Sequence, residues 1–291
     1  MSHHRLLIFY HAECLDGFGG AYAAWKKLGE SAEYIPVKYG HPPPEAEIAG
    51  REIIFIDFCY PKEEMNEIAQ KAKSLVVLDH HEGLREVVES IPQHVFDVNR
   101  SGATIAWDYF HPNEKMPELL KHIEDEDLYR FAMPETRLLG VFLSAYDFSF
   151  PFWDEVATDL ENPEKRKLLL DRANLYLNYF NYLVKLSVEN AHPVIFEGHT
   201  VLLANASPMR TLKSAIGNAL AKKMPPFGLV TSVHPNGIGV SIRGDSSIDV
   251  SAIARKYGGN GHPSASGFRI PWQTPMPFVS AEEHPHEDAS N

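Results

Sequence analysis

The chain has 291 residues, of which 44% are hydrophobic, and its 39 Asp and Glu against 27 Lys and Arg give a formal net charge of −12. This length predicts about two domains on the usual scale of roughly 150 residues each. The acidic balance and the lack of a dense Lys/Arg run argue against a protein that tracks long nucleic acid, because such proteins need a basic stripe. No segment has the roughly 20 consecutive apolar residues of a spanning helix, so we expect a globular protein without a membrane partner.

The cysteine content and the N-terminal segment bear on the compartment. The sequence contains 2 cysteines, too few for a disulfide framework in a chain of this length. The N-terminal segment runs directly into a strand-like stretch, and we expect no signal peptide. A reducing, cytoplasmic environment is the expected localisation.

The first third of the chain alternates strand-like and helix-like segments. Residues 5–29 predict a strand, a turn and an Ala-rich helix, and further strands are expected at 33–37, 51–58, 74–80 and 94–98. This pattern predicts an α/β fold whose N-terminal sheet is mostly parallel and flanked by helices. In such sheets ligands bind beyond the carboxyl ends of the strands.

Helices are expected in the middle of the chain. Ser101 is a candidate N-cap, and residues 116–131 predict a helix that ends in an acidic cluster. A helical stretch from about 163 to 190 carries apolar residues near helical spacing: Leu168, Leu175, Tyr179, Tyr182 and Leu186. We favour core packing and a connection between domains for this stretch over a cofactor or oligomer contact.

The last third predicts hairpins instead. A hairpin, a helix, two strands around an Asn236-Gly237 turn, a helix, a Gly-rich turn, a short helix start and a final strand are expected in this order. The predicted organisation is an N-terminal domain at 1–150, a helical linker at 151–190, a smaller C-terminal α/β domain at 191–272 and a disordered tail at 273–291.

Metal-ligating side chains gather where the predicted strands of the first half end. The candidates are His11, Cys14, Asp16, Asp57, Asp79, His80, His81 and Asp127. Mixed carboxylate and imidazole donors suit Mn²⁺ or a similar divalent ion better than a tetrathiolate zinc site. The set is too large for one tetrahedral centre and predicts two ions, the arrangement typical of in-line phosphoryl transfer.

These motifs resemble those of the DHH phosphoesterases with a DHH-associated second domain. Residues 79–81 match the Asp-His-His triplet, and residues 11–21, 56–58 and 126–131 resemble the first, second and fourth motifs. The Gly-rich residues 258–268 are similar to the signature of the associated domain. The resemblance runs from about residue 6 to 270 in the family's order. It implies a metal-dependent phosphoesterase with an active-site cleft between two domains.

The resemblance also implies roles for single residues. Metal ligation is implied for His11, Asp16, Asp57, His80 and Asp127. Asp57 would bridge the ions, and Asp125 is the alternative to Asp127. Asp79 would orient the site, and His81 would contact the reacting phosphate. Two Mn²⁺ ions are expected, with Mg²⁺, Co²⁺ and Zn²⁺ as alternatives.

Cys14 stands where the family has an Asp. A thiolate could bind a metal and favour softer ions such as Zn²⁺, whereas a neutral thiol would leave one site weak. Packing as a small buried residue is an equal alternative. For Cys59, two residues after Asp57, we favour packing over ligation.

The resemblance further implies substrate binding by six residues of the second domain: Arg243, Gly259, Asn260, Gly261, His262 and Ser264. The glycines allow backbone N–H groups to approach a phosphate, and an arginine can bind it with a bidentate fork. The competing interpretation of the glycines is a helix C-cap at Gly258 followed by a turn. Ser264 is also a candidate helix start.

The expected activity is hydrolysis of short oligonucleotides (nanoRNA) or small nucleotides to 5′-mononucleotides. Long-strand exonucleases of the RecJ type add a further domain and a basic path, and this acidic chain has no such path. The alternatives are a phosphatase of pAp or small phosphate esters, a nucleotide-binding regulator whose metal site Cys14 weakens, and an enzyme controlled by joint oxidation of Cys14 and Cys59. Both a monomer and a homodimer are compatible with the sequence.

Overall fold

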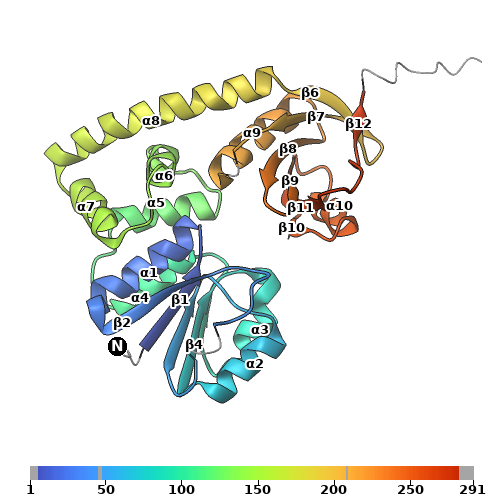
Figure 1. The fold of residues 1–291 in the computed structure, drawn as a ribbon. Coiled ribbons are helices and arrows are strands. Elements are labelled where there is room, and N and C mark those ends of the chain that lie inside the picture. The colour runs from blue at the N-terminus through green and yellow to red at the C-terminus, as the bar shows by residue number, and fades with distance from the viewer. Residues whose placement is uncertain (1–5, 45–47, 208, 282–291) are drawn as a thin grey trace, which may run out of the picture. The chain divides into compact units, whose positions relative to one another are not determined.

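The computed structural model describes residues 6–44, 48–207 and 209–281, and the chain divides into two compact units, residues 1–176 and 177–291 (Figure 1). The first unit contains a parallel sheet flanked by helices and the second a mixed sheet with two helices, so the predicted α/β class is confirmed. Among the described residues, no helix combines the length and the apolar character needed to cross a membrane.

The sheet of the first unit has five strands in the order β2-β1-β3-β4-β5, and every neighbouring pair is parallel. The strands are β1 (Leu6–His11), β2 (Ala32–Val37), β3 (Glu52–Ile56), β4 (Ser74–Asp79) and β5 (Gln93–Phe96). The central strands are apolar on both faces because helices cover both sides of the sheet (Figure 1).

The strand order contains a topological switch at β1. The chain continues from β1 to β2 on one side, and β3 then pairs with the opposite side of β1. The connections that follow β1 and β3 therefore leave the sheet in opposite directions. In sheets of this order, ligands bind at the carboxyl ends of the strands whose connections diverge, here β1 and β3.

Helices α1 (Leu15–Leu28) and α4 (Gly102–Phe110) cover one face of this sheet, and α2 (Lys62–Lys71) and α3 (Arg85–Glu89) cover the other (Figure 1). Short 3₁₀ helices, η1 (Gly29–Ser31) and η3 (Glu82–Leu84), follow α1 and precede α3. Ser101 is the N-cap of α4, as predicted, and its hydroxyl accepts from the backbone N–H of Thr104 at 3.4 Å. This cap fixes the start of α4 beside the strand ends.

Three further helices complete the packing above α1: α5 (Glu118–Asp127), α6 (Thr136–Ser144) and α7 (Phe150–Glu161). The sequence predicted α5, and the predicted helical linker at 151–190 includes nearly all of α7, whereas α6 was missed. Phe18 of α1 stacks on Phe148 and Phe150, with ring centroids 5.0 and 4.9 Å away, and Trp153 is fully buried beside it. This aromatic cluster anchors α7 to α1.

Helix α8 (Pro163–Glu189) agrees with the predicted helical stretch, but the expected packing of its apolar stripe is wrong. Leu168, Leu175, Tyr179, Tyr182 and Leu186 are between 36% and 70% exposed. The buried face of α8 carries Leu169, Ala173 and Phe180 instead. Both sets have helical spacing, so periodicity alone could not tell which one packs inward.

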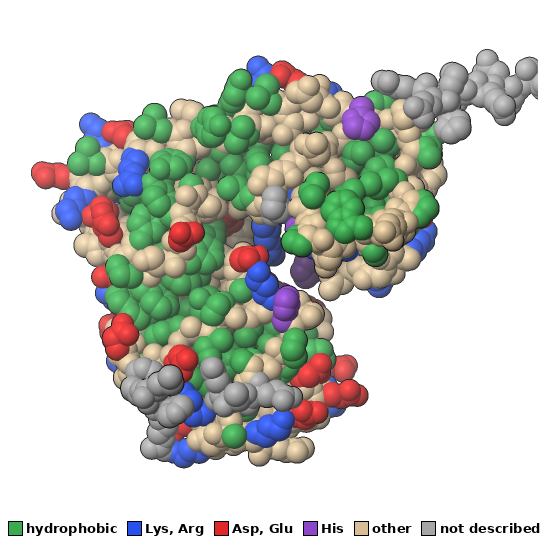
Figure 2. Space-filling model, viewed as in Figure 1, with side chains coloured by type: hydrophobic (Ala, Val, Ile, Leu, Met, Phe, Trp, Pro, Cys, Tyr) green, Lys and Arg blue, Asp and Glu red, His purple; other side chains and the backbone are tan. Residues whose placement is uncertain are grey.

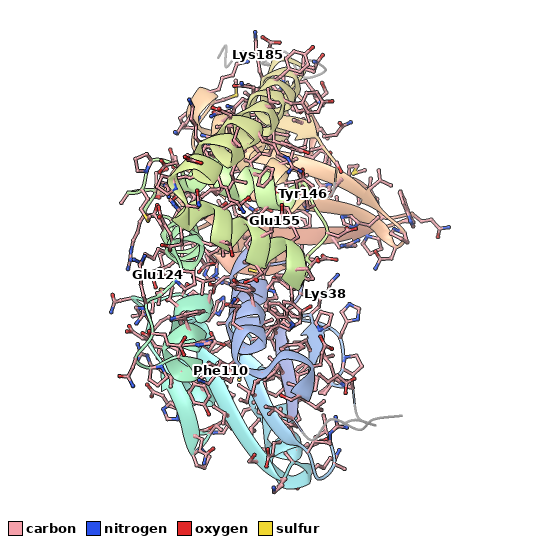
Figure 3. The ribbon with its side chains drawn as sticks, turned by 90° about the vertical axis from the view of Figure 1, so that its left-hand side faces the viewer. Lys38, Phe110, Glu124, Tyr146, Glu155 and Lys185 are labelled. Atoms are coloured by element: carbon pink, nitrogen blue, oxygen red, sulfur yellow. The ribbon has the colours of Figure 1, made fainter. Side chains whose placement is uncertain are left out.

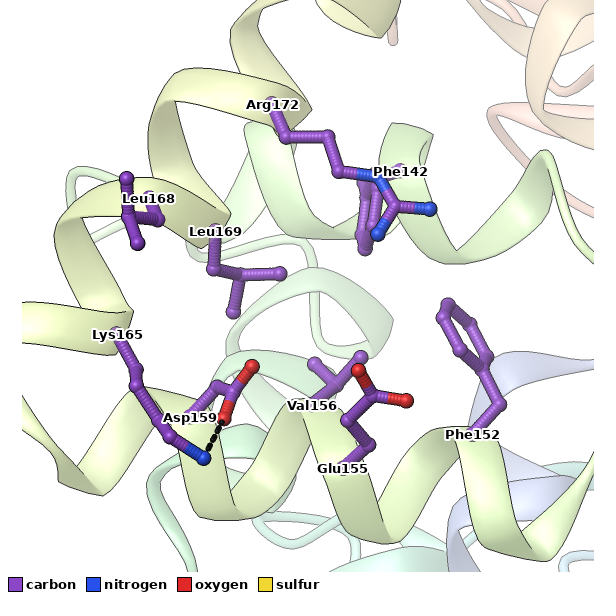
Figure 4. Close-up of a pocket in the computed structure, with 9 residues that line it drawn as sticks. All are labelled: Phe142, Phe152, Glu155, Val156, Asp159, Lys165, Leu168, Leu169 and Arg172. Atoms are coloured by element: carbon purple, nitrogen blue, oxygen red, sulfur yellow. Dashed lines mark ion pairs between the residues drawn. The ribbon is translucent and has the colours of Figure 1, made fainter.

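A surface hollow lies at the start of α8 (Figure 4). Phe142 of α6, Val156 of α7 and Leu169 line its apolar part, and Arg172 extends over the Phe142 ring. Lys165 pairs with Asp159 at 3.2 Å at its edge (Figure 4). The hollow is formed where α6, α7 and α8 pack together. None of the candidate metal ligands is among its lining residues.

The second unit contains a seven-stranded sheet in the order β10-β11-β9-β8-β7-β6-β12, in which only the β7–β8 pair is parallel. Its elements are β6 (His192–Phe196), β7 (His199–Asn205), α9 (Arg210–Lys223), β8 (Phe227–His234), β9 (Gly237–Gly244), α10 (Val250–Lys256), β10 (Asn260–His262), β11 (Ala265–Pro271) and β12 (Val279–Ser280). The predicted β6–β7 and β8–β9 hairpins are present, but the second is closed by Pro235-Asn236 and not by the predicted Asn236-Gly237 turn, because Gly237 already pairs with His234.

Two expectations for this unit are wrong. No helix starts at Ser264; with Pro263 it forms the two-residue turn between β10 and β11, in which His262 pairs with Ala265. The tail is not wholly disordered, because β12 pairs with β6 and Phe278 packs against the core. A single aromatic residue among prolines gave no periodic signal for this short edge strand. Residues 282–291 of the expected tail lie outside the described residues.

Charged side chains of both signs are interspersed over the face that Figure 2 shows, and Lys and Arg form no broad basic area there. This face offers no continuous track for a long polyanion.

Candidate metal centre

The carboxyl ends of β1, β3 and β4 present the predicted ligands to one crevice. His11 ends β1, Asp57 follows β3, and His80 and His81 follow β4. Three sets of ligand atoms lie within 4.8 Å of one another: His11, Cys14 and Asp57; Asp16, His80 and Asp127; and Asp57, Asp79, His80 and His81. All eight predicted ligand candidates therefore belong to one cluster in the first unit.

His80 lies between three carboxylates. Its Nε2 is 3.3 Å from Asp57 Oδ1, 3.4 Å from Asp127 Oδ2 and 3.6 Å from Asp16 Oδ2. Burial disfavours the charged imidazole, but the surrounding carboxylates outweigh burial and raise the pKa of His80 to about 10. The pocket therefore has a strongly negative potential that favours a positive charge at its centre.

Several buried polar atoms of this cluster have no hydrogen-bond partner among the described residues. They are His11 Nδ1, His80 Nε2, Asp57 Oδ2 and Asp79 Oδ2. Buried polar atoms nearly always have a hydrogen-bond partner. One recognised reason for an exception is that the atom is a ligand of a metal ion. Two imidazole nitrogens and carboxylate oxygens left without partners are the donor set that Mn²⁺ or a similar ion takes. The residues present thus fit divalent metal ions.

Asp57 is held in a strained backbone conformation at the centre of the cluster. Its φ is 57°, in the left-handed region that non-glycine residues rarely adopt, and its N–H donates to Leu78 O at 2.9 Å. Burial works to raise the pKa of Asp57, yet His11, His80 and His81 outweigh it and keep that pKa below its ordinary value. Such strain is typical of functional sites.

Asp16 joins the cluster to α4. Its carboxylate accepts from the N–H of Gly102 at 2.6 Å and from the N–H of Ala103 at 2.9 Å, so it caps the N-terminus of α4. Burial and the neighbouring charges of Asp57 and Asp127 raise the pKa of Asp16 well above its usual range. Asp16 thus has a structural task in addition to its position 3.6 Å from His80.

Asp79 holds His81 in place. Asp79 Oδ1 accepts from the backbone N–H groups of His80 and His81 at 2.6 and 2.9 Å, and it lies 2.8 Å from His81 Nδ1. Burial would lower the pKa of His81, but Asp79 and Asp57 outweigh it and raise that pKa. The carboxylate therefore fixes the orientation of the imidazole, in the manner expected of an orienting residue.

The geometry separates Asp127 from Asp125. Asp127 belongs to the set with Asp16 and His80. The Asp125 side chain is buried and accepts from the N–H groups of Ala132 and Met133 at 2.8 and 3.0 Å and from the Thr136 hydroxyl at 2.5 Å. Its oxygens are thus occupied by the loop that follows α5. The i, i+2 spacing in a helix turns the two side chains to different sides.

The two cysteines lie in different surroundings. Cys14 is the N-cap of α1, is buried, and its sulfur belongs to the set with His11 and Asp57. Cys59 is fully buried in the apolar core between the sheet and α2, and its thiol donates to Tyr60 O. Burial, with a contribution from Asp79, raises the pKa of Cys59 to about 12. Cys59 is thus a packed core residue, as the sequence analysis favoured.

The six residues expected to bind substrate lie together at one edge of the second unit's sheet. Gly259, Asn260, Gly261 and His262 lead into or form β10, and Ser264 closes the turn to β11. Arg243 of β9 is opposite Ala265, and its guanidinium donates to Ser214 of α9 at 2.8 Å. Gly258, with φ of 72°, terminates α10, and Gly261, with φ of 139°, lets β10 approach Ser266. Gly258 therefore lies at the C-terminal end of α10, as the competing interpretation of the glycines predicted.

Sequence reasoning missed two residues that shape the centre. A Cβ at Gly102 would lie 2.6 Å from Asp57 Cβ and 3.0 Å from Asp16 Oδ2, so only glycine fits there. Glu124 accepts from Arg100 Nε, from the backbone N–H of Ser101 and from Thr104, and ties α5 to the start of α4. The position of Gly102 directly after a candidate N-cap was the available signal. Glu124 had no such signal, because these three partners are 20 to 24 residues away along the chain.

Comparisons with known proteins support the fold. No family model matches the chain. An uncharacterised protein of Acanthamoeba polyphaga mimivirus is 28% identical over 285 residues, covering 90% of this chain and 66% of that protein. The chain thus spans about two thirds of this relative's length.

Solved structures with the same fold include three proteins that cover more than nine tenths of this chain. An exopolyphosphatase-related protein from Bacteroides fragilis has a TM-score of 0.55 at 14% identity, with 93% of this chain and 87% of that chain covered. The pGpG-specific phosphodiesterase PggH from Vibrio cholerae has 0.52 at 16%, covering 92% and 94%. RecJ from Thermus thermophilus, solved with Mn²⁺, has 0.51 at 13%, covering 91% and 49%. At these low identities the TM-scores show a shared fold alone, and this fold agrees with the one that the motifs imply.

Proposed function

We propose that the protein is a metal-dependent phosphoesterase of the DHH type that hydrolyses short oligonucleotides or small nucleotides to 5′-mononucleotides. The observation that carries the proposal is the cluster around His80, in which unpaired imidazole and carboxylate atoms from three strand ends converge. The fold neighbours lend support, since they include a pGpG-specific phosphodiesterase and a RecJ that was solved with Mn²⁺.

His11, Asp16, Asp57, His80 and Asp127 are the residues that we expect to hold two divalent ions, with Asp57 between them. Ions bound there would supply a positive charge that activates water and neutralises a phosphate. Mn²⁺ is the proposed ion because oxygen and imidazole donors dominate the set. Cys14 is the remaining donor, and its place in the set with His11 and Asp57 supports ligation by its thiolate.

The other residues of the cluster have tasks of their own. His81, oriented by Asp79, is proposed to donate a hydrogen bond to the reacting phosphate, and its raised pKa favours the protonated donor form. Asp57 and His80 are buried, so bulk water does not surround them. Electrostatic interactions are stronger in such surroundings because the local dielectric constant is low. The crevice side remains open at Asp127, whose side chain is 27% exposed.

For the second unit we propose substrate binding by Arg243 and by the loop that includes Gly259, Asn260, Gly261, His262 and Ser264. Backbone N–H groups close to two glycines suit a phosphate, and a guanidinium can add a charge-assisted contact.

A substrate panel tests the function. Metal-replete protein would be incubated with pAp, dinucleotides, pentanucleotides, cyclic dinucleotides and short polyphosphate, and the products separated by chromatography. Release of 5′-mononucleotides from the di- to pentanucleotides supports the proposal, whereas phosphate release from pAp alone would reassign the protein as a phosphatase. A protein that contains metal and cleaves none of these compounds would refute it.

A further inference from the structure

Two exposed aromatic side chains lie in the loop that directly follows α5. Tyr129 is 68% exposed and Phe131 is 41% exposed, and their rings meet edge to face with centroids 4.9 Å apart. Asp127, a member of the candidate metal centre, precedes Tyr129 by two residues, so their Cα atoms are at most about 7 Å apart. The aromatic pair is therefore next to the metal centre in the first unit.

The backbone of this loop is a Schellman motif. The N–H of Arg130 donates to Asp125 O at 2.9 Å and the N–H of Tyr129 donates to Glu126 O at 2.9 Å, the two bonds that define the motif. Tyr129 occupies the left-handed position, with φ of 55°, where glycine is the usual residue. A side chain in this conformation costs about 1–2 kcal/mol.

Phe131 is strained in the same way, with φ of 47°. Burial of the two rings does not offset this cost, because both are exposed. Bulky residues that are kept in unfavourable backbone conformations cluster at ligand-binding sites. The combination of strain, exposure and proximity to Asp127 therefore indicates a binding role for the rings.

Hydrogen bonds on both sides of the two rings hold the loop backbone that carries them. The Asp125 carboxylate accepts from Ala132 and Met133 on the far side of the pair. Between the two aromatic residues, the Arg130 guanidinium donates to Asn99 O at 2.6 Å and to Glu124, which Figure 3 labels, at 3.3 Å. A rigid aromatic surface loses little entropy when it binds a flat ligand.

We propose that Tyr129 and Phe131 form a stacking surface for a nucleobase of the substrate whose phosphate is bound at the metal centre. This inference rests on the proposed function and adds the element that recognises the base. Aromatic side chains stack on every base and carry no sequence preference. The surface therefore suits short substrates of any sequence. For such substrates one stacked base would supply the affinity that a basic track supplies in proteins that bind long nucleic acids.

The decisive variant is Tyr129→Gly. If the ring had only a structural task, its removal would lower the melting temperature; since glycine is favoured at this backbone position, we expect an unchanged or raised Tm. The loss of one stacking contact should weaken AMP binding to the Mn²⁺-loaded full chain by about 5- to 100-fold in calorimetry. Tyr129→Phe keeps the ring and should bind AMP like the wild type.

A second comparison distinguishes base stacking from phosphate binding. KM for the dinucleotide pApA should rise in Tyr129→Gly and Phe131→Gly far more than KM for an analogue of equal length without bases. Tyr109→Ala removes a ring on α4 that is 42% exposed, close to the 41% of Phe131, and serves as the control. Equal AMP affinities of wild type and Tyr129→Gly, or no AMP binding by either, would overturn the inference. Failure of the wild type to cleave any phosphodiester while Tyr129-dependent AMP binding persists would overturn the proposed function alone.

Discussion

Asp57 Oδ1 lies 3.3 Å from Nε2 of His80, and this nitrogen has no hydrogen-bond partner among the described residues. The two residues follow neighbouring parallel strands, β3 and β4, and both are buried. Both atoms are donors that a divalent ion accepts once His80 has lost its proton. Metal ligation would therefore account for a buried nitrogen that lies among three carboxylates without a hydrogen-bond partner.

Replacement of His80 should remove metal from the protein. His80→Ala takes away the donor that three carboxylates surround, and we expect loss of at least one ion per chain and of activity, with unchanged far-UV circular dichroism. Elemental analysis after dialysis measures the metal content. His94→Ala, an exposed histidine on β5, is the control and should retain both ions. Full metal occupancy in His80→Ala would contradict the assignment of the centre.

The stability of the metal-free protein should depend on pH through His80. Its pKa in the folded protein, about 10, exceeds the ordinary value of 6.5, so its contribution to stability is complete below pH 6.5 and is lost as the pH rises towards 10. Mn²⁺ must displace this proton, so the rise in Tm that Mn²⁺ causes should grow over the same pH range. Thermal melts with EDTA or Mn²⁺ measure both trends. A Mn²⁺ effect that is constant with pH would argue against binding at His80.

Gly102→Ala should destabilise the protein. The added methyl group would lie 2.6 Å from Asp57 Cβ, and the start of α4 would have to move away from the strand ends. We expect a loss of about 1–3 kcal/mol, the usual cost of overpacking, together with weaker metal binding. Urea unfolding compares it with Gly83→Ala, since a Cβ at Gly83 meets no atom within 4 Å. Equal stability of the two variants would show that α4 can shift freely.

Replacement of Asp125 should lower the stability of the protein, whereas replacement of Asp127 should lower its metal content. Asp125→Ala removes a buried acceptor of three hydrogen bonds and should cost about 1.5–3 kcal/mol of unfolding free energy. Asp127→Ala should lower the metal content with a much smaller effect on unfolding, because its side chain is partly exposed. Denaturant titration and elemental analysis of both variants test this division. The reverse outcome would make Asp125 the ligand.

The two faces of α8 should differ in their sensitivity to substitution. Leu168→Lys and Leu175→Lys lie on the exposed face and should change the unfolding free energy by no more than about 0.5 kcal/mol. Leu169→Ala removes a buried side chain and should cost about 2–5 kcal/mol. A large effect of the lysine variants would reveal burial of this stripe in solution, which light scattering could trace to self-association.

The sequence by itself determined the parallel sheet and the side chains that meet at its carboxyl edge. Strand-like segments such as residues 74–79 are local patterns, and His11, Asp57 and His80 stand where those patterns stop. Because the carboxyl ends of parallel strands share one edge of the sheet, the convergence of these residues followed from chain order alone. The short strand β12 and helix α6 had weaker local signals and were missed.

Only the tertiary structure decided the questions that depend on contacts between distant residues. The switch at β1 arises from strand order, which periodicity does not encode. The choice of Asp127 over Asp125 depends on a loop that occupies Asp125, and the need for glycine at position 102 depends on Asp57, which is 45 residues away along the chain. The exposure of Leu168 shows the same limit. Apolar spacing identifies a helix face, but only the neighbouring elements determine which face is buried.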